Sequence, residues 1–263
     1  MIVALPRTVL KVSGEGVGEW LDGLLTNRTR ADAPTFAALL TPQGKIIADL
    51  FVTPAEGGVF IDTPEAMGAE LAKRLKMYTL RAPITVEDVS DAMTVHQLFG
   101  PDMDEAELPD GAYPDPRHPS LGYRLITDTT VASDPLDAWD AHRLSLGVPD
   151  SQFDFGSVQV FPADADMDEL NGVDFKKGCF VGQEVVSRMH RLTTAKKRMR
   201  SVVVPDGASA GDPLVTGTRR VGELLHVNGN MAMALLRLDR LASASEAVTV
   251  NGEPAEVMGG PNG

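Results

Sequence analysis

The sequence has little of what marks a secreted or membrane-spanning protein. It contains one cysteine, Cys179, among 263 residues, so an internal disulfide framework is excluded. No apolar run approaches the roughly 18 residues that span a bilayer. The apolar run at the N-terminus is interrupted by Pro6 and Arg7, which is not the pattern of a signal peptide. We therefore expect a soluble protein in a compartment that keeps thiols reduced, and we predict the cytoplasm.

Aromatic residues and common cofactor motifs are also scarce. Aromatics make up 5% of the chain, so the core must consist mostly of Leu, Val, Ile, Ala and Met. The patterns GxGxxG, GxxxxGK[ST], HExxH and CxxC are missing, which argues against Rossmann, P-loop and zinc sites. A structural zinc or iron–sulfur cluster needs about four ligands. We expect no metal site within the chain, although a cluster bridged between two chains stays open.

Positive charge is in deficit, but it is concentrated in one region. The 24 basic and 37 acidic side chains give a formal net charge of −13, which repels polyanions and argues against nucleic-acid binding. Residues 174–200 nevertheless hold eight Lys or Arg and two acids, an excess of +6. Two interpretations stay open for this region: a solvated helix face and loop, or a basic pocket for a small anionic ligand or an acidic partner.

The pattern along the chain predicts an α+β fold with a separate β tail. Helix-like periodicity occurs at residues 17–25, 63–78 and 134–146, and strand-like runs at residues 36–40, 46–52, 59–62, 84–89, 94–99 and 123–126. Residues 100–120 contain five prolines and are expected to form a loop. After Arg198 short strand-like runs alternate with Gly, Pro, Asn and Asp, which is typical of a small antiparallel barrel. We predict a first region at residues 1–192 and a barrel at residues 193–263.

The one cysteine lies in the stretch KGCFVGQE, residues 177–184, just before a helix expected to begin near Gly182 or Gln183. The neighbouring Lys176 and Lys177 and the helix N-terminus would both favour the thiolate form of Cys179. From the residues alone, a buried inert cysteine and a reactive thiol both remain possible.

This stretch resembles the signature Lys-Gly-Cys-aromatic-x-Gly-Gln-Glu of the YgfZ-type folate-binding proteins. That family is related to the aminomethyltransferase, or T protein, of the glycine cleavage system. The resemblance extends over nearly the whole chain: residues 24–27 look like the family's early LTN element, residues 42–52 like its hairpin, and Arg143 with residues 146–149 like its R…GIP segment. The C-terminal strands are similar to its small barrel in place and length.

The resemblance implies a T-protein-like fold. Two intertwined mixed α/β subdomains, built of antiparallel sheets with helices, would surround a central opening that takes tetrahydrofolate, and a small C-terminal antiparallel β-barrel would follow. The implied role is to support assembly or repair of iron–sulfur clusters in client enzymes, which include tRNA-modifying enzymes and [4Fe–4S] dehydratases. The implied partners are a small-molecule folate and iron–sulfur client or assembly proteins, with no direct nucleic acid and no membrane.

The resemblance also points to individual site residues. Cys179 would be the reactive, catalytic thiol. Asp49 could accept hydrogen bonds from pterin N–H groups, and either Arg143 or the basic segment at residues 174–200 could meet the anionic glutamate tail. The residues carried over as folate-binding are Asn27, Asp49, Arg143, Lys177, Gly178, Gly182, Gln183 and Glu184.

One departure bears on activity. The T protein has paired acids where this chain has Ala48-Asp49, and a missing carboxylate weakens aminomethyl transfer because a group that positions or deprotonates the folate is absent. We therefore expect an accessory protein without rapid turnover. A folate-dependent, aminomethyltransferase-like one-carbon transferase is the alternative, and a thiol enzyme or redox sensor that works without folate is a third possibility.

Overall fold

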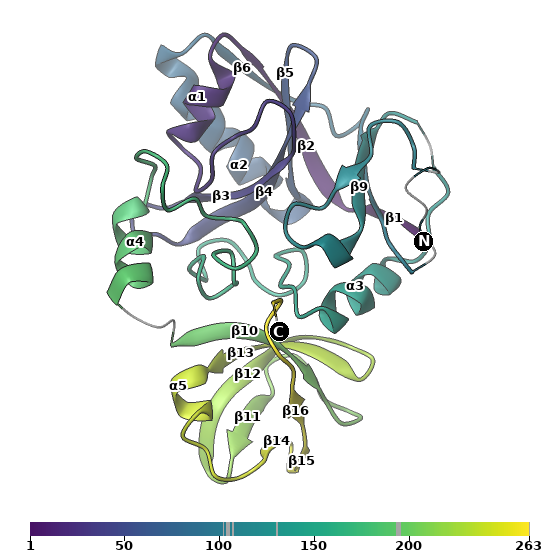
Figure 1. Ribbon diagram of the computed structural model, residues 1–263, viewed down its shortest axis with the longest axis vertical. Helices are drawn as coiled ribbons and strands as arrows, with labels where there is room; N and C mark the ends of the chain where they lie inside the picture. Colours follow the sequence, from purple (N-terminus) through teal and green to yellow (C-terminus); the bar gives the residue numbers. More distant parts are fainter. Residues whose placement is uncertain (102, 104–105, 107, 130, 193–195, 263) are drawn as a thin grey trace.

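The computed structural model describes residues 1–101, 103, 106, 108–129, 131–192 and 196–262. Two antiparallel sheets with their helices form the upper part of Figure 1, and a barrel forms the lower part. Among the described residues, no helix is long and apolar enough to cross a membrane.

The first sheet has five antiparallel strands, and its centre is buried on both faces. Its order is β3 (Thr35–Leu40), β4 (Ile46–Ala55), β5 (Gly58–Pro64), β2 (Arg7–Gly14) and β6 (Ile84–Asp88). All of β3 and the first eight residues of β4 are buried, which explains why they are nearly continuous apolar runs rather than alternating ones. The helix α2 (Glu65–Tyr78) covers one face and buries Met67, Leu71 and Leu75 against it. The shorter α1 (Val17–Asp22) and the 3₁₀ turn η1 (Thr79–Arg81) complete this layer.

The second sheet takes its first strand from the extreme N-terminus. Its order is β1 (Ile2–Leu5), β7 (Thr94–Leu98), β9 (Tyr123–Thr127) and β8 (Tyr113–Pro114). Because β1 belongs to this sheet and β2 to the other, the chain crosses between the two sheets at its start. The helix α3 (Leu136–Ser145) packs beside β1 and ends before Gly147, whose φ of 68° reverses the chain. This arrangement confirms the prediction of two intertwined subdomains.

The third part is a seven-stranded antiparallel sheet curled into a barrel. Its strands are β10 (Lys197–Val203), β11 (Pro213–Thr216), β12 (Arg219–Asn228), β13 (Met231–Arg237), β14 (Val248–Val250), β15 (Glu253–Pro254) and β16 (Glu256–Val257), with the short helix α5 (Leu238–Leu241) after β13. The barrel has a core of its own, while Met199 and Met233 belong to the core of the N-terminal region. The predicted boundary between residues 192 and 193 lies at residues 193–195, outside the described residues.

Between α3 and the helix α4 (Gln183–Leu192), residues 148–182 contain no helix or strand, yet much of this segment is buried. Backbone turns and aspartate side chains together satisfy its backbone: the N–H of Gly172 donates to the carbonyl oxygen of Met167, and Asp154 and Asp164 accept hydrogen bonds from the N–H groups of Asp150 and Phe161. Satisfied backbone groups allow an irregular segment to occupy the space between the sheets and the barrel.

Three features differ from the sequence-based expectations. Strands β1 and β2 were not predicted, because Pro6 divides their apolar residues into short runs. The helix expected at residues 17–25 ends at Asp22. The loop expected at residues 100–120 contains β8 and the 3₁₀ turn η3 (Pro119–Leu121), and four of its residues, 102, 104, 105 and 107, lie outside the described ones.

Candidate functional site

Lys177 of the KGCFVGQE stretch points inward and fastens the stretch to the first subdomain. Its Nζ donates to the carbonyl oxygens of Leu25 and Asn27, both at 2.8 Å. Burial lowers the pKa of this ammonium group. The side chain of Asn27 donates in turn to the carbonyl oxygens of Phe36 and Asn171. The structure thus brings the predicted residues Asn27 and Lys177 together, and both hold the stretch in place.

Cys179 and Gly178 lie on the outside of this loop. The thiol of Cys179 is free and exposed, while the next residue, Phe180, is buried in the main core. The sequence left open a buried inert cysteine, and the exposed sulfur rules it out. The loop therefore presents a thiol to the solvent between two fixed points, Lys177 and Phe180.

The glycine that follows is required by close packing. Gly182 has a φ of 82°, and a Cβ on it would lie 2.7 Å from the carbonyl oxygen of Thr41. One turn of α4 later, Val185 packs against Gly44 of the same β3–β4 turn. Gln183 and Glu184 form the first turn of α4, where an acid complements the helix dipole. The second half of the stretch therefore docks α4 onto the hairpin.

The predicted residue Asp49 lies on β4 and is buried, with its side chain against the irregular segment. Its carboxylate accepts a short hydrogen bond from the hydroxyl of Ser151. Burial, followed by the nearby charge of Asp150, raises the pKa of Asp49, while Arg7 and Arg117 act in the opposite direction. This carboxyl group therefore favours the protonated form more than an ordinary aspartate does.

Arg143 is fully buried, and its guanidinium is engaged by the protein. Its Nε donates to Asp140 at 2.8 Å, and one terminal nitrogen donates to Asp154 at 2.6 Å and to the carbonyl oxygen of Val148 at 3.2 Å. The geometry gives Arg143 a structural role in holding the start of the irregular segment. Direct contact of Arg143 or Asp49 with a folate stays a prediction.

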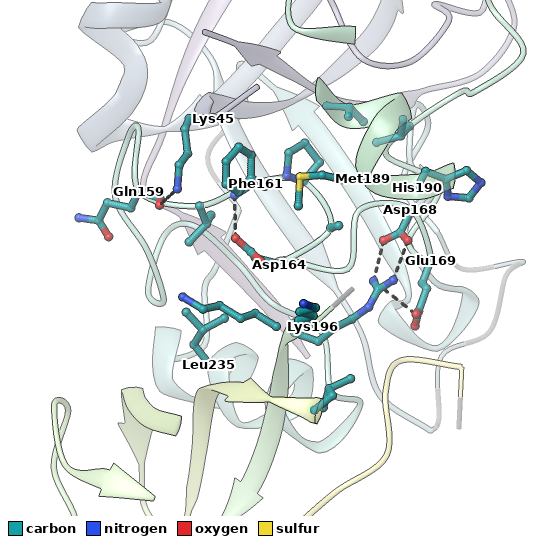
Figure 2. A pocket seen from close by; sticks show the side chains of 18 of the residues that line it. Lys45, Gln159, Phe161, Asp164, Asp168, Glu169, Met189, His190, Lys196 and Leu235 are labelled. Atoms are coloured by element: carbon teal, nitrogen blue, oxygen red, sulfur yellow. Dashed lines mark hydrogen bonds and ion pairs between the residues drawn. The ribbon is translucent and has the colours of Figure 1, made fainter. Parts of the chain in front are cut away.

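A cavity of about 850 Å³ lies beside the stretch, between the irregular segment, α4 and the barrel. In Figure 2, Lys45 and Phe161 lie on the side of the N-terminal region, Met189 and His190 extend from α4, and Leu235 lies on the barrel. None of the predicted site residues lines it. The flanks of the stretch do: Phe175 comes two residues before Lys177, and Val186 two residues after Glu184.

The walls of this cavity offer flat surfaces. The rings of Phe175 and His190 stack with centroids 3.8 Å apart and an interplanar angle of 16°. On another wall, the Nζ of Lys45 lies 4.1 Å from the centroid of the Phe161 ring and donates to the carbonyl oxygen of Gln159. Aromatic faces of this kind suit a flat, partly apolar ligand.

Asp164 differs from the other acids of the cavity. Asp168 and Glu169 form ion pairs with Arg198, at 2.7 Å and 3.4 Å. Among the described residues Asp164 has no such ion pair, and one of its oxygens accepts a hydrogen bond from the N–H of Phe161 at 3.0 Å. Burial raises its pKa. Among the described residues, no hydrogen bond reaches its second oxygen.

The barrel side of the cavity is basic. Arg198 and Arg200 are held by Asp166, whereas Lys196 and Lys197 are exposed and form no ion pair with any described residue. The excess of positive charge predicted at residues 174–200 therefore includes a basic pocket wall. The sequence did not identify Lys45, Asp164 and Arg237 as site residues, because they come from distant parts of the chain and meet only in the folded protein. The clustered positive charge of residues 174–200 was the one signal in the sequence that pointed to the cavity.

Metal ligands are not clustered in this part of the molecule. Among the described residues, no group of three or more His, Cys, Asp or Glu side chains is arranged to hold a metal ion. A metal centre at Cys179 would need ligands from elsewhere.

Residues 196–258 match the family described as the CAF17 C-terminal beta-barrel domain. The chain is 29% identical over 240 residues to the mitochondrial iron–sulfur cluster assembly factor IBA57 homolog of Neurospora crassa, and 30% identical over 270 residues to that of Mycosarcoma maydis. Its homologues are iron–sulfur cluster assembly factors. Human mitochondrial IBA57 is 28% identical over 274 residues.

The alignments cover most of this chain and less of its relatives. They include 79%, 92% and 89% of this chain for the Neurospora, Mycosarcoma and human proteins. The chain spans 54%, 66% and 76% of the lengths of those relatives.

A solved structure confirms the predicted fold. The crystal structure of the glycine cleavage system aminomethyltransferase T from Bartonella henselae matches 99% of this chain and 85% of its own, with a TM-score of 0.77 and 16% identity. The T-protein-like architecture with a C-terminal barrel is therefore correct. The relatives named here are IBA57 proteins, so the resemblance to the YgfZ-type family stays a prediction.

The predicted cytoplasmic location is wrong on this comparison. Each of these relatives is named as a mitochondrial protein. The prediction used the lack of a secretory pattern and the single cysteine, and neither feature distinguishes the cytoplasm from other compartments that keep thiols reduced.

Proposed function

We propose that this chain is an accessory protein of iron–sulfur cluster assembly that binds a reduced folate in the cavity beside α4. The observation that carries the assembly role is the similarity to IBA57 assembly factors over most of the chain. The exposed thiol of Cys179, on a loop fixed on both sides, supports it. The folate is supported by the chemistry of the cavity.

The cavity has the groups that a tetrahydrofolate needs. Its volume lies within the usual range of ligand sites, roughly 300–1,000 Å³. The open oxygen of Asp164 would accept from pterin N–H donors, which is the role that the sequence suggested for Asp49. Lys196 and Lys197 would bind the carboxylates of the glutamate tail. The protein would thereby orient the folate between apolar walls and hold its charged end at the barrel.

Cys179 would act at the surface and on a second protein. The chain has no other cysteine, so a cluster bound at this sulfur would take its remaining ligands from a partner. We expect that partner to be an iron–sulfur assembly or client protein, with tRNA-modifying enzymes among the clients. Because the thiol does not line the cavity, folate binding and thiol chemistry are separable functions, and we expect no rapid turnover.

Complementation in cells tests this proposal. Loss of the gene should lower the activities of [4Fe–4S] enzymes; wild-type protein should restore them and Cys179→Ser should not. Purified Cys179→Ser should still bind tetrahydrofolate as the wild type does. Full rescue by Cys179→Ser would refute the role of the thiol, and unchanged [4Fe–4S] activities without the gene would refute the assembly role.

A further inference from the structure

The C-terminal end of α2 carries apolar side chains that the protein leaves uncovered. Leu80 is 86% exposed, Met77 is 55% exposed, and Tyr78, between them in the sequence, is also exposed. Among the described residues six large hydrophobic side chains are exposed, and these three lie within four positions of the sequence. Single exposed apolar residues are ordinary on a protein surface, whereas a contiguous group marks a surface that another molecule covers.

Two of these side chains line a shallow groove along α2. The groove is lined by six residues at helical spacing: Ala69, Ala72, Lys73, Lys76, Met77 and Leu80. The spacing places them in one stripe along α2 and the 3₁₀ turn η1 that continues it. The two alanines leave room for the close approach of a second helix, and Met77 and Leu80 can pack beside it.

The groove is positively charged on a protein that is acidic as a whole. Residues 69–80 contain three basic side chains and one acid, while the formal net charge of the chain is −13. The acid, Glu70, forms an ion pair with Arg74 at 2.7 Å. Lys73 and Lys76 are exposed and form no ion pair with any described residue. A partner whose apolar stripe is flanked by carboxylates would therefore complement the groove in charge as well as in shape.

Two other occupants fit the charge less well. In a symmetric dimer through this surface, each copy would set its own lysines against those of the other copy, and two chains of net charge −13 repel each other. An anionic lipid surface would meet the negative field of the whole protein, whereas a helix contacts only the groove.

The groove is also separate from the site described above. Among the described residues, none lines both the groove and the cavity, and none of residues 177–184 lines the groove. In Figure 1, α2 lies in the upper part of the molecule, against the first sheet, and the barrel lies at the bottom. From these observations we infer that the groove along α2 is a docking site for an acidic amphipathic helix of a partner protein. A partner bound there leaves the exposed thiol and the cavity free, so the chain can hold two partners at once.

Fluorescence polarisation of the full-length protein with two synthetic helical peptides tests the inference. Both peptides have the same leucine stripe, which glutamates flank in one peptide and lysines in the other. Wild type should bind the glutamate peptide at least about tenfold more tightly, because the two lysines of the groove attract one peptide and repel the other. Added salt should reduce this preference.

Variants of exposed residues locate the binding. Leu80→Ser should weaken binding of the glutamate peptide at least about tenfold, because it removes an apolar contact at the groove. Lys73→Gln/Lys76→Gln should bind the two peptides equally. The control Met258→Ser removes an exposed apolar side chain outside the groove and should match wild type. Circular dichroism verifies that each variant is folded.

Four results would overturn the inference. Two of them are equal binding of both peptides by wild type and full binding of the glutamate peptide by Leu80→Ser. Self-association of wild type that Leu80→Ser abolishes would assign the groove to a second copy. Binding to phosphatidylglycerol vesicles that Leu80→Ser abolishes would assign it to a lipid surface. None of these results bears on folate binding or on the thiol, because the groove involves neither.

Discussion

Adjacent residues of the KGCFVGQE stretch have opposite environments, and this contrast is visible only in the structure. Lys176 is exposed, whereas the ammonium group of Lys177 is buried and donates to two backbone carbonyl oxygens. The sequence identified both as neighbours of the thiol that would lower its pKa. The structure assigns one of them to the support of the loop instead.

Replacement of Lys177 by Met should destabilise the protein by about 2 kcal/mol, because two buried carbonyl oxygens lose a charged donor. Lys176→Met should change the free energy of unfolding by less than about 0.5 kcal/mol, since it alters an exposed side chain. Urea denaturation measures both. Similar values for the two variants would contradict the structural role of Lys177.

Asp49 gives a pH-dependent prediction. Its pKa in the folded protein is raised above the ordinary value of 3.8, chiefly by burial. As the pH rises past 3.8, the carboxyl group therefore loses its proton in the unfolded chain before it does so in the folded protein. The free energy of unfolding of the wild type falls over this range, until the pH exceeds the raised pKa of the folded protein. Asp49→Asn removes this cost and should be more stable than wild type by about 1 kcal/mol at neutral pH.

The advantage of Asp49→Asn should disappear below pH 3.8, where the carboxyl group is protonated in both states. Denaturation of wild type and variant across this range tests the sign. A variant that is less stable at neutral pH, or an advantage that grows as the pH falls, would contradict the account.

At the scale of elements, the sequence predicts the helices and strands that have a regular pattern of apolar residues. It does not predict segments that buried polar side chains hold inside the protein. The β3–β4 hairpin and α4 follow from apolar runs and turn residues and lie where they were expected. Residues 148–182 are held by side chains such as Asp154 and Asp164, which have no pattern that marks them as interior. For the same reason the sequence located the KGCFVGQE stretch, but not the cavity, whose walls come from four separate parts of the chain.

The two glycines of the stretch form a matched pair for testing how α4 docks. Gly182→Ala should cost about 2 kcal/mol or more, because its φ of 82° is strained for alanine and the new Cβ meets the carbonyl oxygen of Thr41. A Cβ on Gly178 meets no atom within 4 Å, so Gly178→Ala should be neutral within about 0.5 kcal/mol. Thermal unfolding compares them; equal effects would show that α4 does not depend on this close approach.

At the scale of the whole molecule, the cavity exists because the barrel is docked against the N-terminal region. His226 and Asn228 on β12 both bond the carboxylate of Asp140 on α3, at 2.6 Å and 2.8 Å. The hydroxyl of Ser201 on β10 donates to the carbonyl oxygen of Leu144 at 2.6 Å. The same Asp140 also holds Arg143, so barrel docking and the start of the irregular segment share one carboxylate.

His226→Ala should therefore cost about 1–2 kcal/mol and loosen the interface between α3 and the barrel. Amide hydrogen exchange should increase in α3 and β12 while the centre of the first sheet stays protected. Arg220→Ala, on the same strand with an exposed ion pair to Glu223, is the control and should change little. Unchanged exchange in α3 would contradict the importance of this contact.

The most direct test of the account is calorimetric titration of tetrahydrofolate into wild type, Asp164→Asn and Asp49→Asn. We predict that wild type binds, that Asp164→Asn binds at least about tenfold more weakly because it loses a charged acceptor, and that Asp49→Asn binds like wild type. Absence of binding by wild type, or loss of binding in Asp49→Asn with full binding in Asp164→Asn, would contradict the claim that this cavity holds the folate.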